Sequence, residues 1–234
     1  MANESAQDHR GSSRITGKFS FLFVFLLADL AVYTYSGRSA FTPLYRALNI
    51  LILVSSVYAV SFRRLTWIVA LIIAIPVAFH LIPHGYEVPL APSKLELAGI
   101  ALSVALDTFI IVVIFKRVFQ TREVNADAIY GAVSIYLLVG FAFARVYGVL
   151  VALESSSFYL DPLLNHHTVA TLSDLTYYSF VTMTSLGAVG ISPASDQARS
   201  ISVVESVLGI LYLGVLVSRL IAAYRPSGNS DAQT

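Results

Sequence analysis

The feature that most constrains this chain is a series of six long apolar segments separated by short polar connections. A helix needs about 20 residues to cross the ~30 Å hydrocarbon core of a bilayer, and the second segment reaches that length only if it begins near Phe41. Backbone groups in lipid must bond within their own segment, so the sequence predicts an all-α fold of six transmembrane helices. The segments are residues 19–35, 47–62, 65–82, 95–115, 128–153 and 201–224.

Composition indicates that lipid surrounds these helices. The chain is 56% hydrophobic and only 12% charged, whereas soluble domains contain roughly 25% charged residues. So much apolar surface cannot be enclosed in one small globule, and we expect a multi-pass protein of the cell membrane with lipid as a partner. Net charge is near zero, so nucleic acid is not an expected partner. The absence of cysteine excludes disulfides and cysteine metal sites.

Lysine and arginine predict the orientation. Residues 1–18 are expected to form a disordered cytosolic tail, and residues 225–234 a short cytosolic one. The connections on the side of the two tails contain more basic residues, such as Arg64 and Arg117, than the opposite ones. The positive-inside rule therefore predicts that both termini are cytoplasmic.

The connection between the fifth and sixth segments, residues 154–200, contains a short helix followed by glycine. Asp174 could cap a helix over residues 175–184, because a carboxylate accepts hydrogen bonds from the free N–H groups of a first turn. That helix is too short to cross a bilayer. Residues 187–190 then read Gly-Ala-Val-Gly, which alone would also suit an ordinary turn. Between two spans, however, the arrangement predicts a re-entrant loop, whose backbone must be covered by protein or by the water of a pore.

A family resemblance rests on residues 177–193, which read Y-Y-S-F-V-T-M-T-S-L-G-A-V-G-I-S-P. This segment resembles the pore signature of potassium channels, commonly Y-F-S-F-V-T-L-T-T-V-G-Y-G-D-I-S-P in bacterial members. Without a gap, Thr184 and Ser185 match the paired threonines, and Gly187 matches the first filter glycine. The chain is thus similar to the potassium-channel-type pore-loop cation channels. The likeness covers residues 126–224, and the first four spans only in layout.

The resemblance implies a voltage-gated-like channel fold and a homotetramer in a bacterial inner membrane. Residues 19–122 would form a four-helix transmembrane domain. Residues 123–224 would form a pore domain of outer helix, pore helix, filter and inner helix. No enzymatic activity, catalytic residue or cofactor is expected.

The resemblance also implies a filter in which four chains present rings of backbone carbonyls that replace the water around a permeant cation. Potassium would bind at Ser185, Leu186 and Gly187, and sodium is a second candidate for permeation. The implied filter residues are Thr184, Ser185, Leu186, Gly187, Ala188, Val189 and Gly190.

The filter departs from the family pattern at three positions. Ala188 replaces a tyrosine, Val189 the second glycine, and Gly190 an aspartate. A β-branched residue resists positive φ, so Val189 is not expected to keep the family geometry. One interpretation is that the inner sites persist while the outer ones are reshaped, which gives weak discrimination between sodium and potassium. A second is that other contacts stabilise the filter and Gly190 takes over the turn. A third is a non-conducting scaffold or sensor with a collapsed filter.

Two further expectations concern the spans around the filter. Glu205, near the outer end of the sixth span, is expected to brace the pore helix. Gly209 and Gly214 in the same span could form a gating hinge or permit close helix packing, and both interpretations stay open. The fourth segment contains no arginine ladder, so steep voltage gating is not expected.

Isolated polar residues lie within the spans. Asp29, Asp107 and His80 are expected to be satisfied by nearby hydroxyls, although Asp29 with Asp107 could bind a proton or a cation. Arg145 needs an acidic or carbonyl partner that the sequence does not identify. The candidate hydroxyls are those of Tyr33, Ser55 and Ser56. His166 and His167 in the outer loop are expected to be solvated.

Overall fold

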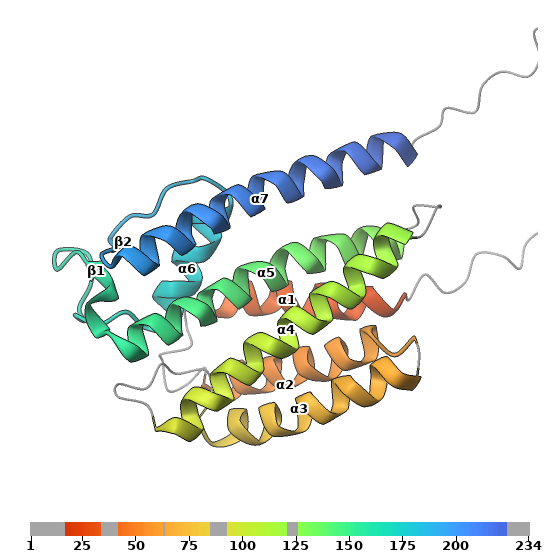
Figure 1. The fold of residues 1–234 in the computed structure, drawn as a ribbon, viewed down its shortest axis with the longest axis horizontal. Coiled ribbons are helices and arrows are strands. Elements are labelled where there is room, and N and C mark those ends of the chain that lie inside the picture. The colour runs from red at the N-terminus through yellow and green to blue at the C-terminus, as the bar shows by residue number, and fades with distance from the viewer. Residues whose placement is uncertain (1–16, 34–41, 63, 85–92, 121–125, 224–234) are drawn as a thin grey trace, which may run out of the picture.

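The computed structural model describes residues 17–33, 42–62, 64–84, 93–120 and 126–223. The two predicted tails, apart from Gly17 and Lys18, lie outside these residues. Within them the chain is helical, with one small two-stranded sheet (Figure 1). The elements are α1 (Lys18–Val32), α2 (Thr42–Ala59), α3 (Arg64–His84), α4 (Lys94–Gln120), α5 (Ala126–Leu153), β1 (Phe158–Leu160), α6 (Leu172–Met183), β2 (Ile191–Pro193) and α7 (Asp196–Ala223).

Each predicted apolar segment overlaps one of the long helices. α2 begins at Thr42, close to the start that the second segment required. Three helices in the described part of the chain are long and apolar enough to cross a bilayer, over Lys94–Gln120, Ala126–Leu153 and Asp196–Ser218. The apolar stretches of α2 and α3 are shorter, and α1 has 15 residues. The chain is therefore a helical membrane protein with three candidate spans, and six spans remains a prediction.

The helices lie side by side with their long axes roughly aligned, and α5 lies between α7 and the group α1–α4 (Figure 1). The start of α1 lies beside the start of α5, where the Phe19 N–H donates to Asp127 at 3.0 Å. The Lys18 ammonium also donates to the Ser61 carbonyl at the end of α2, at 3.0 Å. α1 and α2 therefore run in opposite directions, as expected when a short connection joins successive spans, whereas α1 and α5 run in the same direction.

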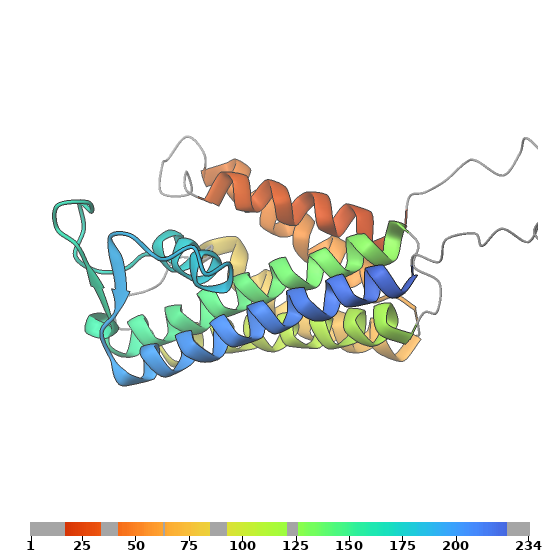
Figure 2. The same ribbon diagram turned by 90° about the horizontal axis from the view of Figure 1, so that it is seen from above.

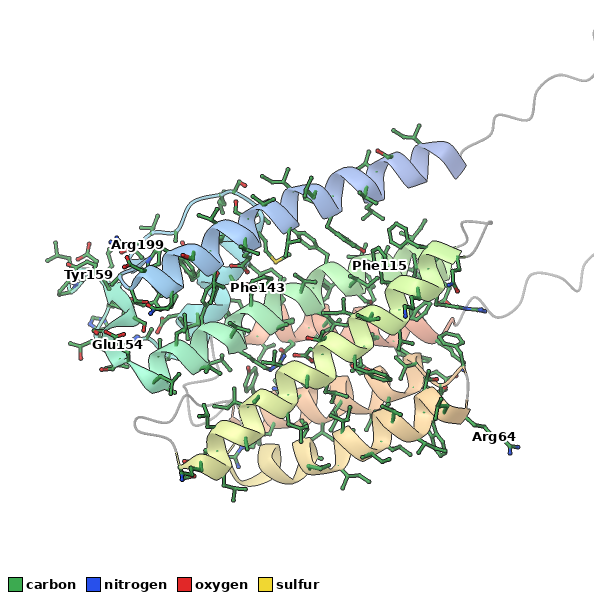
Figure 3. The ribbon with its side chains drawn as sticks, in the orientation of Figure 1. Arg64, Phe115, Phe143, Glu154, Tyr159 and Arg199 are labelled. Atoms are coloured by element: carbon green, nitrogen blue, oxygen red, sulfur yellow. The ribbon has the colours of Figure 1, made fainter. Side chains whose placement is uncertain are left out.

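Charged side chains gather at the two ends of this bundle. Arg64 lies at one end, Glu154 and Arg199 lie at the other, and Phe143 lies between them (Figure 3). Exposed apolar side chains such as Ile72 and Val112 cover the sides. Such a surface fits a bilayer, because its apolar middle can face hydrocarbon while its charged ends face water.

Two hydrophobic cores hold the helices together. The larger one joins α1–α4 to the first half of α5 around Leu22, Ile114 and Ile135. The smaller one lies at the end of α5, where the rings of Tyr147, Phe158 and Tyr178 stack edge to face. Their centroids are 5.1 to 5.3 Å apart, within the range that favours aromatic pairs. The second core therefore fixes β1 and α6 against α5.

The two glycines of α7 lie in different surroundings. A Cβ atom at Gly209 would lie 2.6 Å from the Met183 carbonyl oxygen at the end of α6, whereas one at Gly214 would meet nothing within 4 Å. The packing interpretation therefore holds for Gly209 and not for Gly214. A gating hinge at either residue stays a prediction.

We expect Gly209→Ala to push α7 away from α6 and to lower the free energy of unfolding by about 1–3 kcal/mol, the usual cost of overpacking. Gly214→Ala is the matched control, and better helix propensity makes it neutral or slightly stabilising. Thermal unfolding in detergent measures both. Equal melting temperatures for the two variants would contradict the close approach at Gly209.

Candidate functional site

The half-helix α6 begins with a capping box. The Thr171 hydroxyl accepts from the Asp174 N–H at 3.3 Å, and the Asp174 carboxylate accepts from the Thr171 N–H at 2.8 Å. The predicted cap at Asp174 is therefore wrong, because Asp174 is the third residue of a helix that begins at Leu172. This helix has 12 residues, too few to cross a bilayer, and it occupies only one half of the length of α5 (Figure 2).

Just after α6, the sign of the backbone angle φ changes twice within residues 185–187. Ser185 has φ 56° and Gly187 has φ 88°, while Leu186 between them does not have a positive φ. Ser185 and Leu186 are tied to α6, because their N–H groups donate to the carbonyls of Thr182 and Val181 at 3.1 and 2.9 Å. The part of the loop that carries the predicted inner ion sites is therefore anchored on the pore helix.

The outer part of the loop does not continue this alternation. The next positive φ is 80° at Gly190, and Val189 does not have one. Gly190 thus takes the turn, in agreement with the second interpretation. A positive φ is costly for a β-branched residue and easy for glycine, which explains why the left-handed position falls on Gly190.

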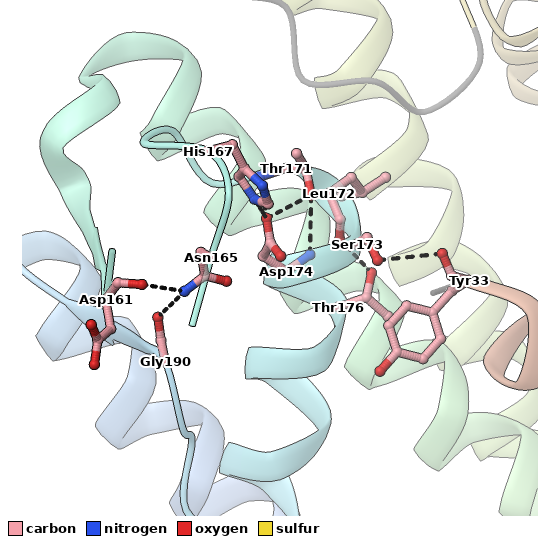
Figure 4. Close-up of polar contacts among 10 residues, drawn as sticks. All are labelled: Tyr33, Asp161, Asn165, His167, Thr171, Leu172, Ser173, Asp174, Thr176 and Gly190. Atoms are coloured by element: carbon pink, nitrogen blue, oxygen red, sulfur yellow. Dashed lines mark hydrogen bonds and ion pairs between the residues drawn. The ribbon is translucent and has the colours of Figure 1, made fainter. Parts of the chain in front are cut away.

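Contacts from the outer loop hold this end of the filter. The Gly190 carbonyl accepts from the Asp161 N–H at 2.9 Å and from the Asn165 amide at 2.8 Å (Figure 4). The Tyr177 hydroxyl on α6 accepts from the Val189 N–H at 3.3 Å. Beyond Gly190, β2 pairs antiparallel with β1, with Tyr159 opposite Ser192. These contacts hold the segment in which Ala188 and Gly190 replace the tyrosine and the aspartate of the family pattern.

The middle of the loop lies at the surface of the single subunit. Leu186 is 78% exposed and Val189 is 68% exposed. Thr184, Ser185 and Gly187 are also exposed, whereas Ala188 is half-buried against the second core. A loop tied down at both ends and exposed between them can present its backbone to ions or to neighbouring chains.

Behind the loop, a buried polar cluster joins α5, α6 and α7. Glu205 is fully buried on α7, and its carboxylate accepts from the hydroxyls of Tyr147 on α5 and Ser179 on α6. The hydroxyl of Tyr178 on α6 donates to Ser202 on α7 at 2.7 Å. Hydrogen bonds to a charged group are stronger than neutral ones, so Glu205 fixes the pore helix between its two long neighbours.

The polar residues within the spans differ in whether the structure gives them a partner. Arg145 on α5 forms an ion pair with Asp107 on α4, which is the partner that the sequence did not identify. The predicted hydroxyl partners of Asp107 are therefore wrong, and Ser55 bonds within its own helix. Asp29 is buried, and its Oδ1 has no partner in the described part of the chain. The side chain of His80 lies outside the described residues.

The outer-loop histidine is not simply solvated. His167 Nε2 lies 2.7 Å from the Asp174 carboxylate, next to the cap of α6 (Figure 4). His166 is exposed. Among the described residues no group of three or more histidine, cysteine or acidic side chains could hold a metal ion.

The fold and the loop define a class of protein. A half-helix followed by an anchored, glycine-containing loop between two spans is the architecture of a pore-loop membrane protein. Residues 133–225 match the family model described as Ion channel. No curated protein and no solved structure matches the chain. This match confirms the resemblance to the potassium-channel-type pore-loop cation channels over residues 133–225, which are similar to an ion channel domain.

We expect Glu205→Ala to lower the free energy of unfolding by about 1–3 kcal/mol, because it removes the buried carboxylate that accepts from Tyr147 and Ser179. The Tyr147 hydroxyl then keeps only the Ser202 hydroxyl, at 3.3 Å, and the Ser179 hydroxyl keeps only the Gly140 carbonyl, at 2.7 Å. Glu154→Ala is the control, since Glu154 is an exposed acid at the end of α5. Thermal unfolding in detergent measures both variants. A Glu205→Ala protein as stable as the Glu154→Ala protein would contradict the bracing contact.

Proposed function

We propose that the chain is one subunit of a homotetrameric, potassium-channel-like cation channel that conducts ions passively through a carbonyl-lined filter. The observation that carries this proposal is the alternating backbone at Ser185 and Gly187, exposed at the surface of the subunit. Positive φ at alternate residues lets successive carbonyls face the same side, and a filter is built from rings of such carbonyls.

The surface of α7 supports the tetramer. α7 is the least enclosed of the three candidate spans, and its apolar side chains, such as Val204, Leu208 and Leu211, are exposed along its length. Part of that surface would face lipid and part would pack against the neighbouring subunit around the pore. A ring of four is the closed symmetry in which four equivalent loops surround one axis.

The proposed subunit crosses the membrane six times, with both termini in the cytoplasm of a bacterial cell. Residues 19–122 form its four-helix domain and residues 123–224 its pore domain. The gathering of Lys18, Arg64 and Arg117 where α1, α3 and α5 begin and α4 ends supports this orientation.

The ion preference follows from the backbone of the loop. Ser185, Leu186 and Gly187 provide the potassium sites, because only there does the backbone alternate at a spacing of two residues. Ala188 and Val189 interrupt that spacing, so we propose fewer coordinating rings and permeation by both potassium and sodium. Selectivity depends on the number of coordinating carbonyls, and a shorter series discriminates less.

The first test is cation flux into liposomes that contain the purified protein, with Gly187→Ala as the loss-of-function variant. Within the subunit the added Cβ meets no atom within 4 Å, so the substitution acts there through the backbone at φ 88° and not through a clash. We expect potassium flux to fall about tenfold or more, because alanine at positive φ costs about 1–2 kcal/mol per subunit. Glu154→Ala, which changes an exposed side chain outside the filter and the inner helix, should conduct like the unchanged protein. No flux of either ion in the unchanged protein would favour the non-conducting scaffold.

The second test is the reversal potential with potassium on one side and sodium on the other. We expect the two permeabilities to lie within about tenfold of each other, a difference below about 1.4 kcal/mol. A potassium preference of several hundredfold would contradict weak selectivity. It would mean that the contacts of Tyr177 and Asn165 maintain a complete set of sites.

A further inference from the structure

A small internal cavity lies where α1, α2, α3 and α4 meet α5, far from the pore loop. Its volume is about 20 Å³, enough for one water-sized species. Most of the lining is apolar, from residues such as Leu26, Ile110 and Phe141. The polar part of the lining comes from four helices and consists of Asp29, Ser56, Ser103, Asp107 and Arg145.

The charges around this cavity do not balance. Asp107 is paired with Arg145. Asp29 on α1 is only 3% exposed, lines the same cavity, and has no hydrogen-bond partner for its Oδ1 in the described part of the chain. Among the described residues, two carboxylates and one guanidinium leave one negative charge in a buried site. A buried charge without compensation is strongly unfavourable, so the site favours either a proton on Asp29 or one more positive charge.

The size and charge of the site limit which species can supply the positive charge. A divalent metal ion would need more carboxylates, and the described residues contain no group of three or more metal-ligating side chains. One missing charge corresponds to a monovalent ion. Hard cations prefer oxygen ligands, which the Asp29 carboxylate and the hydroxyls of Ser56 and Ser103 can provide.

We propose that Asp29, together with Ser56 and Ser103, binds one monovalent cation of sodium size inside the helix bundle. The ion would lie between α1, α2 and α4, next to Arg145 on the outer helix of the channel domain. It would neutralise the cluster and hold α1 against α4 and α5. The site is separate from the conduction path, so the proposal does not depend on whether the filter conducts.

The test is thermal unfolding of the full-length protein in detergent, with sodium chloride replacing N-methyl-D-glucamine chloride at constant ionic strength and pH. Sodium well above its dissociation constant should raise the melting temperature by about 3 °C and then saturate, because a ligand that binds only the folded state stabilises it. Asp29→Asn should lose this sodium response. Glu96→Gln, on α4 but outside the cavity, should keep it.

The variant separates this site from the filter, since a sodium effect that arises in the filter would persist in Asp29→Asn. Full persistence would overturn the proposal. A melting temperature that responds to pH and not to sodium would also overturn it, because a proton would then neutralise Asp29. Ser103→Ala gives a second test that keeps both carboxylates. It should raise the sodium concentration of the half-maximal response about threefold or more, and an unchanged value would count against the site.

Discussion

The constraint on which the rest of the structure depends is that non-helical backbone at membrane depth must find partners for its peptide groups. The loop after α6 meets this requirement at both ends. Its first N–H groups, those of Ser185 and Leu186, bond back to α6. Its last residues, Val189 and Gly190, bond to Tyr177 and to the outer loop. The loop is exposed between residues 184 and 187, and this exposed part is the one proposed to face the ions.

α5 joins the two parts of the structure. On one side, Arg145 pairs with Asp107, and the larger core joins α5 to α1–α4. On the other side, Tyr147 and the aromatic core hold α6 and β1, while Glu205 joins them to α7. A displacement of α5 would therefore move both Arg145 in the buried charge cluster and Tyr147 in the polar cluster behind the pore loop. The two polar clusters lie on one helix and link the helical bundle mechanically to the channel domain.

The sequence predicted the features that depend on local pattern. Apolar length located every long helix, and seventeen ungapped residues located the half-helix and the loop. It missed the features that depend on residues far apart in the chain. Asn165 and Gly190 are 25 positions apart, and Arg145 and Asp107 are 38 apart. Whether Arg145 meets Asp107 depends on how each helix is rotated about its axis, and whether Asn165 meets Gly190 depends on how two loops fold against each other. Apolar length specifies neither. The cap was missed because Thr171 and Asp174 are both good cap residues, and only the geometry distinguishes them.

The central claim is that the backbone oxygens of Ser185, Leu186 and Gly187 from four copies converge on one axis and coordinate a cation. A density map of the purified protein, recorded in thallium or rubidium as a heavy substitute for potassium, tests this claim most directly. The account predicts a fourfold assembly with ion density on its axis at the level of these three residues. A monomer or dimer, or a tetramer whose axis lies away from them, would contradict it.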